Sequence, residues 1–278
     1  MKPVSQKESS ITEEFRPGLR LSTIRAFFFD LDGVLSVGKE NPRYLGGRDV
    51  TLKIKSSGRK AFLLTNDSTH TRDEISQNLA RMGFNFSKDE ILTSSYLTSL
   101  YLLRKYGKCK FFLVGERGLL HELEFAGHRN VEKDPDVVVV GFDRGLTYAK
   151  LDRALWALRN GAKLIGSYGG AVFMSDHGPA LSAGPIIKAL EYGAGKRTIM
   201  IGKPSPRMFH LALHVADVKA SQAVMVGDQI ETDIIGARRA GVHTILVLTG
   251  VENPETVASS KVKPEMVVEN VDSLLDLL

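Results

Sequence analysis

Two carboxylates follow a strongly hydrophobic stretch near the start of the chain. Residues 26–35 read AFFFDLDGVL, so Asp30 and Asp32 come directly after three phenylalanines and before Gly33. Such a run predicts a strand buried on both faces, and carboxylates at its end are costly to desolvate unless they are paired or bind a metal. If the strand continues, both side chains point to one face, where one carboxylate can act as a nucleophile and the other as a general acid and base. Gly33 allows the backbone to turn sharply after them.

Polar side chains also follow three other hydrophobic stretches. Thr65 and Asn66 end AFLLTN, Lys203 follows TIMIG, and Asp228 follows AVMVG, with Asp233 a little further along. In an open parallel sheet, ligands bind beyond the carboxyl ends of the strands. A single residue of this kind is more often a turn former or a helix cap. Because polar residues follow all four of these predicted strands, they instead indicate one shared site.

The residue types at these strand ends suit a phosphoryl group and a divalent ion. Asp30, Asp32 and Asp228 bring three negative charges together, which requires a cation, and a ligand set made only of oxygen favours Mg²⁺. Lys203 adds a positive charge, and the residues after the second stretch supply hydroxyl, amide and backbone N–H donors. This combination predicts a site that holds a phosphoryl group.

The hydrophobic stretches alternate with amphipathic segments, which predicts a doubly wound α/β fold with a parallel sheet. A first set of strands is expected at 26–30, 61–65, 198–202, 223–227 and 244–248. A second set is expected in the middle of the chain, with strands at 110–115, 136–142, 162–168 and 171–175 and helices at 117–127 and 147–161. The second set contains enough material for a separate α/β module inserted into the first.

These elements divide the chain into a core, an inserted module and a terminal extension. We expect the core to comprise 24–104 and 184–278, and the module to comprise 105–183, with boundaries uncertain by several residues. Residues 1–23 are polar and are expected to form an N-terminal extension.

The composition is that of a globular protein with a sizeable core. The chain has 278 residues, of which 43% are hydrophobic, and a mean hydropathy of −0.08. No apolar stretch approaches the roughly 20 residues of a membrane span, and no secretory signal is evident, so a cytoplasmic location is expected. The net charge of +5 is spread along the chain, which argues against a nucleic-acid partner and suits a small anionic substrate. The single Cys109 is expected to pack in a strand, because no nearby histidine is evident.

Four segments carry a resemblance to a known family. In order, DLDGVL, LLTNDS, GKPSPRMF and VGDQIETDIIGA resemble the four motifs of the haloacid dehalogenase superfamily, most closely its p-nitrophenylphosphatase and phosphoglycolate phosphatase-like branch. That branch carries a large α/β cap between its second and third motifs, where the inserted module falls here. The resemblance runs over roughly 24–250 and includes VVVVGFDRGLTYAKL in the cap. It implies a Rossmann-like core, a Mg²⁺-dependent phosphatase acting on a small phosphorylated metabolite, and a homodimer formed through the cap.

The resemblance also implies roles for the residues of the first motif and their partners. Asp30 would form an aspartyl-phosphate, and Asp32 would be the general acid and base. Mg²⁺ would lie between the Asp30 carboxylate, the Asp32 backbone carbonyl and Asp228. Asp233 would hold the metal end of the site in place.

The other motif residues would bind the phosphoryl group. Thr65 and Asn66 would bind its oxygens, with Gly33 counted among the phosphate-binding residues, and Lys203 would neutralise the charge and orient Asp30.

Two departures from the family pattern stand out. Asp67 replaces a second amide in motif two, and GSYGGAVFMSDHGPAL, residues 166–181, replaces the usual Thr-Asn-Pro-Asp type of stretch in the cap.

Within that cap stretch, Asp176 and His177 are candidates for substrate specificity.

Taken together, the motifs and their order predict a Mg²⁺-dependent phosphomonoester hydrolase. A phosphotransferase or phosphomutase on the same core remains an alternative, as does a binding protein without catalysis.

Overall fold

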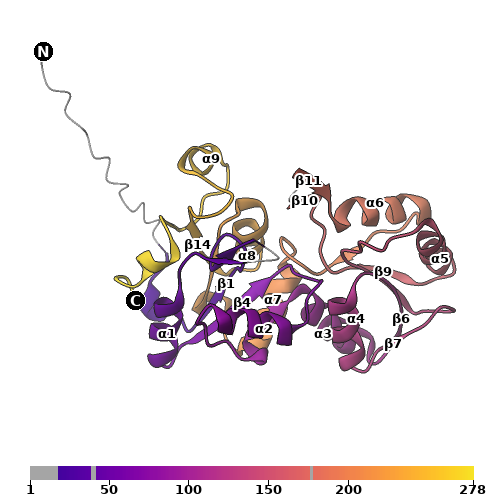
Figure 1. Cartoon of the computed structure of the whole chain (residues 1–278), viewed down its shortest axis with the longest axis horizontal. Helices are drawn as coiled ribbons and strands as arrows, with labels where there is room; N and C mark the ends of the chain where they lie inside the picture. The colour runs from indigo at the N-terminus through magenta and orange to yellow at the C-terminus, as the bar shows by residue number, and fades with distance from the viewer. Residues whose placement is uncertain (1–17, 39–41, 176–177) are drawn as a thin grey trace, which may run out of the picture.

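The computed structural model describes residues 18–38, 42–175 and 178–278. These residues form two α/β units side by side, each built on a parallel sheet, which confirms the predicted fold class (Figure 1). No helix in the described part of the chain is long and apolar enough to cross a membrane.

The first unit contains a six-stranded parallel sheet with the two strands of the first and last motifs at its centre. The order is β15 (Met266–Val268), β14 (His243–Val247), β13 (Ala223–Gly227), β1 (Ala26–Phe29), β4 (Lys60–Thr65) and β5 (Ile91–Thr93). Because all the strands run in parallel, their carboxyl ends lie at one edge of the sheet. Phe29 pairs with Val226 on one side and Leu63 on the other, which brings the residues after these strands close together.

Helices cover both faces of this sheet because consecutive residues of β1 point to opposite sides. Phe27 and Phe29 pack with residues of α1 (Arg48–Ser56) and α2 (Arg72–Arg81), whereas Phe28 packs with residues of α3 (Ser94–Tyr106) and α7 (Pro206–Ala216). The remaining elements of the first unit are shorter: β2 (Ser36–Val37), β3 (Arg43–Tyr44), α8 (Ile235–Arg239), α9 (Pro254–Ser259), a π-helical turn (Ile230–Ile234) and 3-10 turns at Leu21–Thr23, Lys88–Glu90, Ala220–Gln222 and Val271–Leu274.

The second unit contains a five-stranded parallel sheet and a hairpin. The sheet order is β12 (Ile199–Met200), β9 (Lys163–Gly166), β8 (Val137–Val140), β6 (Lys110–Val114) and β7 (Arg129–Asn130). Helix α4 (Arg117–Phe125) packs on one face, and α5 (Tyr148–Arg159) and α6 (Ala183–Ala194) pack on the other. The hairpin consists of β10 (Val172–Ser175) and β11 (Gly178–Leu181).

Two strands differ from the sequence-based expectation. The stretch 198–202 was expected in the first sheet, but β12 pairs with β9 at the edge of the second sheet. The stretch 171–175 pairs antiparallel with β11 and does not join a parallel sheet. A hydrophobic stretch predicts a strand, but the edge that accepts it depends on non-local packing. We therefore propose that the inserted unit extends past residue 184 to about residue 201.

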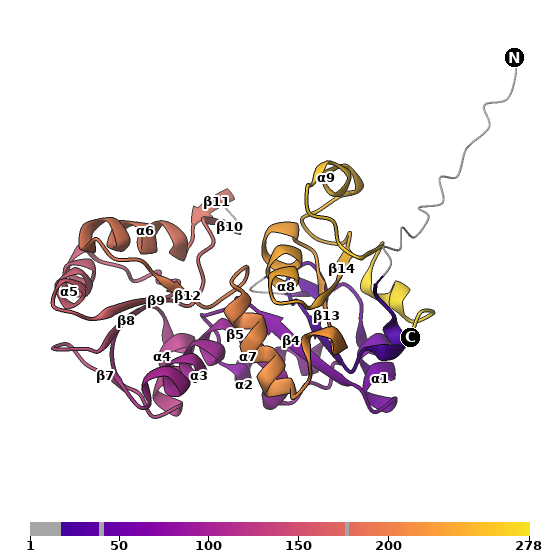
Figure 2. The same cartoon turned by 180° about the vertical axis from the view of Figure 1, so that it is seen from behind.

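The two units share one hydrophobic cluster. Phe28 and Phe209 of the first unit belong to the same buried cluster as Phe111 and Val139 of the second. Helices α3 and α4 pack against each other at this junction. Figure 2, seen from behind, shows α3 and α4 lying together between the two sheets. The units are thus joined by packed core as well as by the two chain connections.

An ion pair crosses the same junction and is almost completely buried. Arg72 Nε of α2 lies 3.1 Å from Glu122 Oε1 of α4, and the two side chains are 4% and 1% exposed. The Arg72 guanidinium also lies over the ring of Tyr96, 3.8 Å from its centroid. Nearby, the backbone N–H of Gly118 donates to the carbonyl of Thr69 at 3.1 Å. The inserted unit is therefore attached directly to the segment that follows β4.

Removing the charge of Glu122 should destabilise the protein. In Glu122→Gln, the Arg72 guanidinium stays buried without its counter-charge, so we expect a loss of about 3 kcal/mol in the free energy of unfolding. Urea denaturation measures this loss. The exposed Glu124 on the same helix provides the control Glu124→Gln, which should change little. A Glu122→Gln variant as stable as this control would contradict the assigned role.

Candidate active site

Lys203 joins two carboxylates from different strand ends. Its Nζ lies 2.9 Å from Asp30 Oδ1 and 2.7 Å from Asp233 Oδ1. The Lys203 and Asp233 side chains are 1% and 0% exposed, so these contacts are sheltered from water. Asp30 Oδ1 also accepts a hydrogen bond from the Leu31 N–H at 2.8 Å. Asp233 therefore contacts Lys203, the residue that the sequence predicts to orient Asp30.

Asp228 lies against this pair in a space that two glycines create. Its Oδ2 accepts a hydrogen bond from the Val251 N–H at 2.9 Å. A Cβ built on Gly33 would come within 2.4 Å of Asp228 Oδ2, and one built on Gly250 within 2.0 Å. Gly33 also has a φ of +81°, which a side chain would disfavour. Its N–H donates to the Ser36 carbonyl at 2.8 Å, and the expected contact of Gly33 with phosphate stays a prediction.

The carboxylate oxygens form a cluster that suits a metal ion. Oxygen atoms of Asp30, Asp228 and Asp233 lie within 4.8 Å of one another. Asp228 Oδ1 is buried and has no hydrogen-bond partner among the residues that the structure describes. A buried oxygen without a partner costs free energy unless a ligand contacts it. An all-oxygen set of this kind is chemically suited to Mg²⁺.

The charges in the cluster strongly affect one another. Burial, followed by the neighbouring Asp30 and Asp233, raises the pKa of Asp228 to about 8. Burial is also the main cause that raises the pKa of Asp233 to about 6, although Lys203 opposes it. Burial alone would lower the pKa of Lys203, but the carboxylates of Asp233 and Asp30 outweigh it and raise that pKa. The lysine is thus charged, and the carboxylates hold more negative charge than it neutralises.

Asp32 lies in a different environment from Asp30. Strand β1 ends at Phe29, so the strand does not continue through both aspartates as the argument from one shared face required. Asp32 instead forms an isolated β-bridge with Ser36 and is exposed, whereas Asp30 is 8% exposed. The pair is therefore split into a buried aspartate and an exposed one.

The residues after β4 form a tight turn beside Lys203. Asn66 Oδ1 accepts from the Lys203 N–H at 2.8 Å, and Asn66 Nδ2 donates to the Lys203 carbonyl at 3.1 Å. This reciprocal pair positions the lysine backbone. Thr65 Oγ1 accepts from the Asp67 N–H at 3.1 Å, which leaves its hydroxyl hydrogen for another acceptor.

Asp67 does not bring its carboxylate into the cluster. Its Oδ1 accepts from the Thr69 N–H at 2.7 Å, and its Oδ2 lies 2.7 Å from His70 Nδ1. Burial tends to raise the pKa of Asp67, but the hydrogen bond and charge of His70 outweigh it and lower that pKa. The departure from the family pattern in motif two is therefore accommodated within the turn.

The sequence analysis did not identify the loop after β14, although this loop completes the site. Thr249 Oγ1 donates to the Gly33 carbonyl at 2.6 Å, and the Glu252 N–H donates to the Asp228 carbonyl at 3.3 Å. The glycine in the segment LTGV was the only local signal, because it marks a place where another group approaches the backbone closely.

Two other expectations have different outcomes. Asp176 and His177 lie outside the described residues, so their proposed part in specificity stays a prediction. Cys109 does have a histidine neighbour, since its Sγ lies 3.3 Å from His128 Nδ1. Burial nevertheless raises the pKa of the Cys109 thiol to about 11, which agrees with a packing role.

Two family models match this chain. The model described as haloacid dehalogenase-like hydrolase matches residues 27–129, and the one described as HAD-hydrolase-like matches residues 200–274. These ranges contain the four strand ends that form the cluster.

Similar proteins cover almost the whole chain and are phosphatases. The ribonucleotide monophosphatase NagD of Escherichia coli is 31% identical over 90% of this chain and 97% of its own length. A human phospholysine phosphohistidine inorganic pyrophosphate phosphatase is 32% identical over 94% of this chain and 96% of its own length. The crystal structure of a 4-nitrophenylphosphatase from Thermotoga maritima is 32% identical, covers 92% of this chain and 98% of that one, and has a TM-score of 0.86. The resemblance drawn from the four motifs is confirmed: the chain belongs to the haloacid dehalogenase-like hydrolases, among the phosphatases of that family.

Proposed function

We propose that this chain is a Mg²⁺-dependent phosphatase that hydrolyses small phosphomonoesters through an aspartyl-phosphate on Asp30. One observation carries the proposal: Lys203 contacts Asp30 and Asp233 at 2.9 and 2.7 Å, beside the unpartnered Oδ1 of Asp228. A buried lysine that contacts two carboxylates beside a third suits a site that binds a phosphate anion and a metal cation together.

The contacts of Asp30 differ between its two carboxylate oxygens. Both the Lys203 ammonium and the Leu31 N–H contact Oδ1. No described residue donates a hydrogen bond to Oδ2, so we assign this oxygen to attack on phosphorus. The bond from phosphorus to the leaving oxygen breaks as the bond to Oδ2 forms, and the exposed Asp32 protonates the departing alkoxide. Asp32 then removes a proton from the water that hydrolyses the aspartyl-phosphate.

The phosphoryl oxygens would be held by the core. The donors that we assign to them are the Thr65 hydroxyl at the end of β4, the second N–H of the Asn66 side-chain amide and the ammonium of Lys203, which follows β12. Lys203 offsets the charge that builds up on the equatorial oxygens in the transition state.

The residues present fit the proposed Mg²⁺. The carboxylates of Asp30 and Asp228 and the backbone carbonyl of Asp32 would hold the ion, with Asp233 placed behind them against Lys203. When bound, Mg²⁺ would supply positive charge that offsets the carboxylates and the phosphate.

The substrate is proposed only as a small phosphorylated metabolite. Three relatives are named for ribonucleotides, acid sugars and 4-nitrophenyl phosphate, and these names agree on a phosphate ester and differ in its alcohol. The human relative is instead named for phospholysine, phosphohistidine and inorganic pyrophosphate, which are not esters of an alcohol. A cytoplasmic location and a homodimer through the cap stay predictions from the sequence and the family resemblance. A phosphotransferase would instead pass the phosphate to added alcohols or sugars, which analysis of the products distinguishes.

Replacement of the nucleophile should abolish turnover. Asp30→Asn keeps the shape of the side chain but removes its charge and nucleophilicity, so phosphate release should fall at least about 1000-fold. Release of phosphate from p-nitrophenyl phosphate measures the rate.

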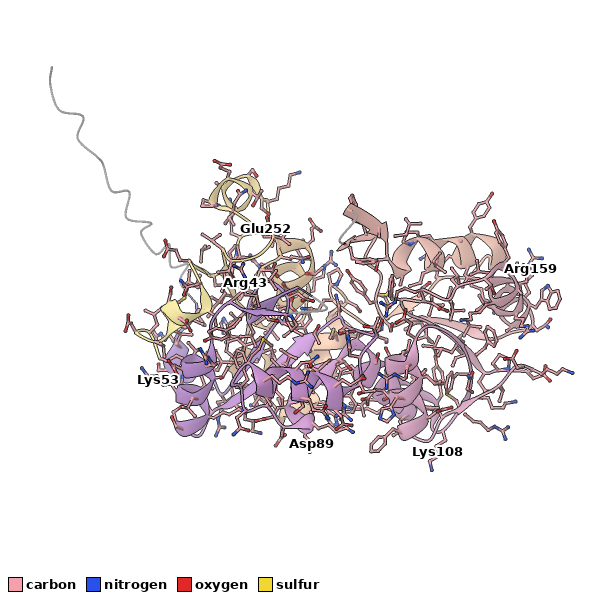
Figure 3. The ribbon with its side chains drawn as sticks, viewed as in Figure 1. Arg43, Lys53, Asp89, Lys108, Arg159 and Glu252 are labelled. Carbon is pink, nitrogen blue, oxygen red and sulfur yellow. The ribbon has the colours of Figure 1, made fainter. Side chains whose placement is uncertain are left out.

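The control for this change is Asp89→Asn, because Asp89 lies on the outer surface of the first unit (Figure 3). The control should keep the wild-type rate. Near-normal turnover by Asp30→Asn would end the nucleophile assignment.

The metal-free protein should lose stability as the pH rises. The folded-state pKa of Asp228, about 8, lies above the ordinary carboxyl value of 3.8, so the folded state keeps a proton that the unfolded state has lost. Stability from this group is greatest below the unfolded pKa and falls as the pH rises through about 8. In EDTA, the wild-type Tm should therefore drop more between pH 6.5 and pH 8.5 than that of Asp228→Asn.

Added Mg²⁺ should restore the wild-type Tm at pH 8.5, because the cation neutralises the ionised carboxylates. It should have little effect on Asp228→Asn, in which one carboxylate is missing. Equal losses of Tm in the two proteins, or equal responses to Mg²⁺, would contradict the proposed charge cluster.

A further inference from the structure

The inserted unit contributes a tyrosine to the edge of the candidate active site. Tyr168 follows β9, two residues beyond its end, in the cap stretch that departs from the family pattern. The Gly202 N–H donates to the Ser167 carbonyl at 2.9 Å. A Cβ built on Gly202 would lie 3.4 Å from the Tyr168 Cα and 2.7 Å from Asn66 Oδ1. Tyr168 thus lies beside the residue that precedes Lys203 and beside the turn of motif two.

A second glycine defines where the phenol lies. A Cβ built on Gly170 would come 1.9 Å from the Tyr168 hydroxyl oxygen. Gly170 is itself held by its carbonyl, which accepts from the Gly184 N–H at the start of α6 at 2.9 Å. Its φ is not in the left-handed region, so the backbone would accept alanine there. The glycine is required by the position of the phenol.

The phenol is electrostatically coupled to the catalytic cluster. Burial is the largest cause that raises the pKa of Tyr168, Lys203 lowers it, and the charges of Asp30 and Asp233 raise it again. The hydroxyl therefore stays protonated at neutral pH and can donate a hydrogen bond. No described residue forms a hydrogen bond with this hydroxyl, although the side chain is more than half covered.

The neighbouring strand end of the second unit carries apolar groups. In the parallel register Val140 pairs with Gly166, and Phe142 and Tyr168 each follow two residues beyond these strand ends. Phe142 packs edge-to-face on Phe173 of the hairpin, with ring centroids 4.9 Å apart. The strand end next to that of Tyr168 thus carries an aromatic pair.

We propose that the Tyr168 hydroxyl hydrogen-bonds the alcohol part of the substrate and selects phosphomonoesters whose leaving group carries hydroxyl groups, such as sugar or nucleoside phosphates. This inference rests on the proposed phosphatase function. The groups assigned to the phosphoryl oxygens and to attack belong to the core, and in-line displacement places the leaving group away from Asp30. The second unit reaches this site through Tyr168, which lies beside Gly202, the residue before Lys203. A leaving group without polar atoms leaves the phenol without a partner, and a site built in this way rejects such an analogue.

The test compares two esters and one product. In Tyr168→Phe, kcat/KM for ribose 5-phosphate should fall about fivefold to tenfold, as expected for one lost hydrogen bond, while kcat/KM for phenyl phosphate should stay within about twofold. The inhibition constant of inorganic phosphate, which has no leaving group, should not change. Gly170→Ala should show the same selective loss, because its methyl group displaces the phenol.

Two matched variants control for changes elsewhere in the second unit. Tyr148→Phe alters a tyrosine that is 86% exposed, and Gly145→Ala adds a Cβ that meets only Asp143 Oδ1, at 3.4 Å. Both should behave as wild type.

The outcomes separate this inference from the proposed function. If wild type hydrolyses both esters in an EDTA-sensitive reaction and Tyr168→Phe matches it on both, the phosphatase stands and the role of Tyr168 is wrong. Equal losses for both esters and for inorganic phosphate would also overturn the leaving-group assignment. A wild-type protein that releases phosphate from neither ester would overturn the proposed function itself.

Discussion

An excess of buried negative charge is the constraint on which the rest of this structure depends. Asp30, Asp228 and Asp233 bring their oxygens within 4.8 Å of one another, and Lys203 is the ammonium that contacts two of them. Within the described residues nothing completes the contacts of Asp228 Oδ1. Such a cluster is tolerable in an interior only if a cation shares it or one carboxyl group keeps its proton, as the raised pKa of Asp228 indicates. The proposed Mg²⁺ and the proposed chemistry both follow from this imbalance.

Glycines make the cluster sterically possible. Gly33 and Gly250 flank the Asp228 carboxylate, and a Cβ on Gly227 would lie 2.4 Å from the Cβ of Asp233. Each of these positions lets a backbone segment approach a carboxylate more closely than any side chain would allow. The same device recurs in the second unit, where Gly170 makes space for the phenol of Tyr168. Glycines at these positions thus allow the short distances between the charged groups.

The attachment of the second unit determines what faces the cluster. The shared hydrophobic cluster and the buried Arg72–Glu122 pair join α4 to the first unit, and the Asn66–Lys203 hydrogen bonds join the turn after β4 to the segment after β12. Lys203 is therefore supplied by a strand of the second sheet but serves a site on the first. A shift of the second unit at this point would therefore also move Lys203.

The sequence by itself determined the fold class and the residues of the cluster, because buried strands and the polar groups that follow them are local patterns. Asp30, Lys203 and Asp228 were identifiable for this reason, and so was the family. Only the tertiary structure decided that β12 pairs with β9, that Asp233 contacts Lys203, and that Asp32 lies exposed beyond the end of β1. It also decided that Tyr168 lies beside Gly202. These are contacts between residues far apart in the chain, which depend on how whole sheets and helices pack and leave no periodic trace in the sequence.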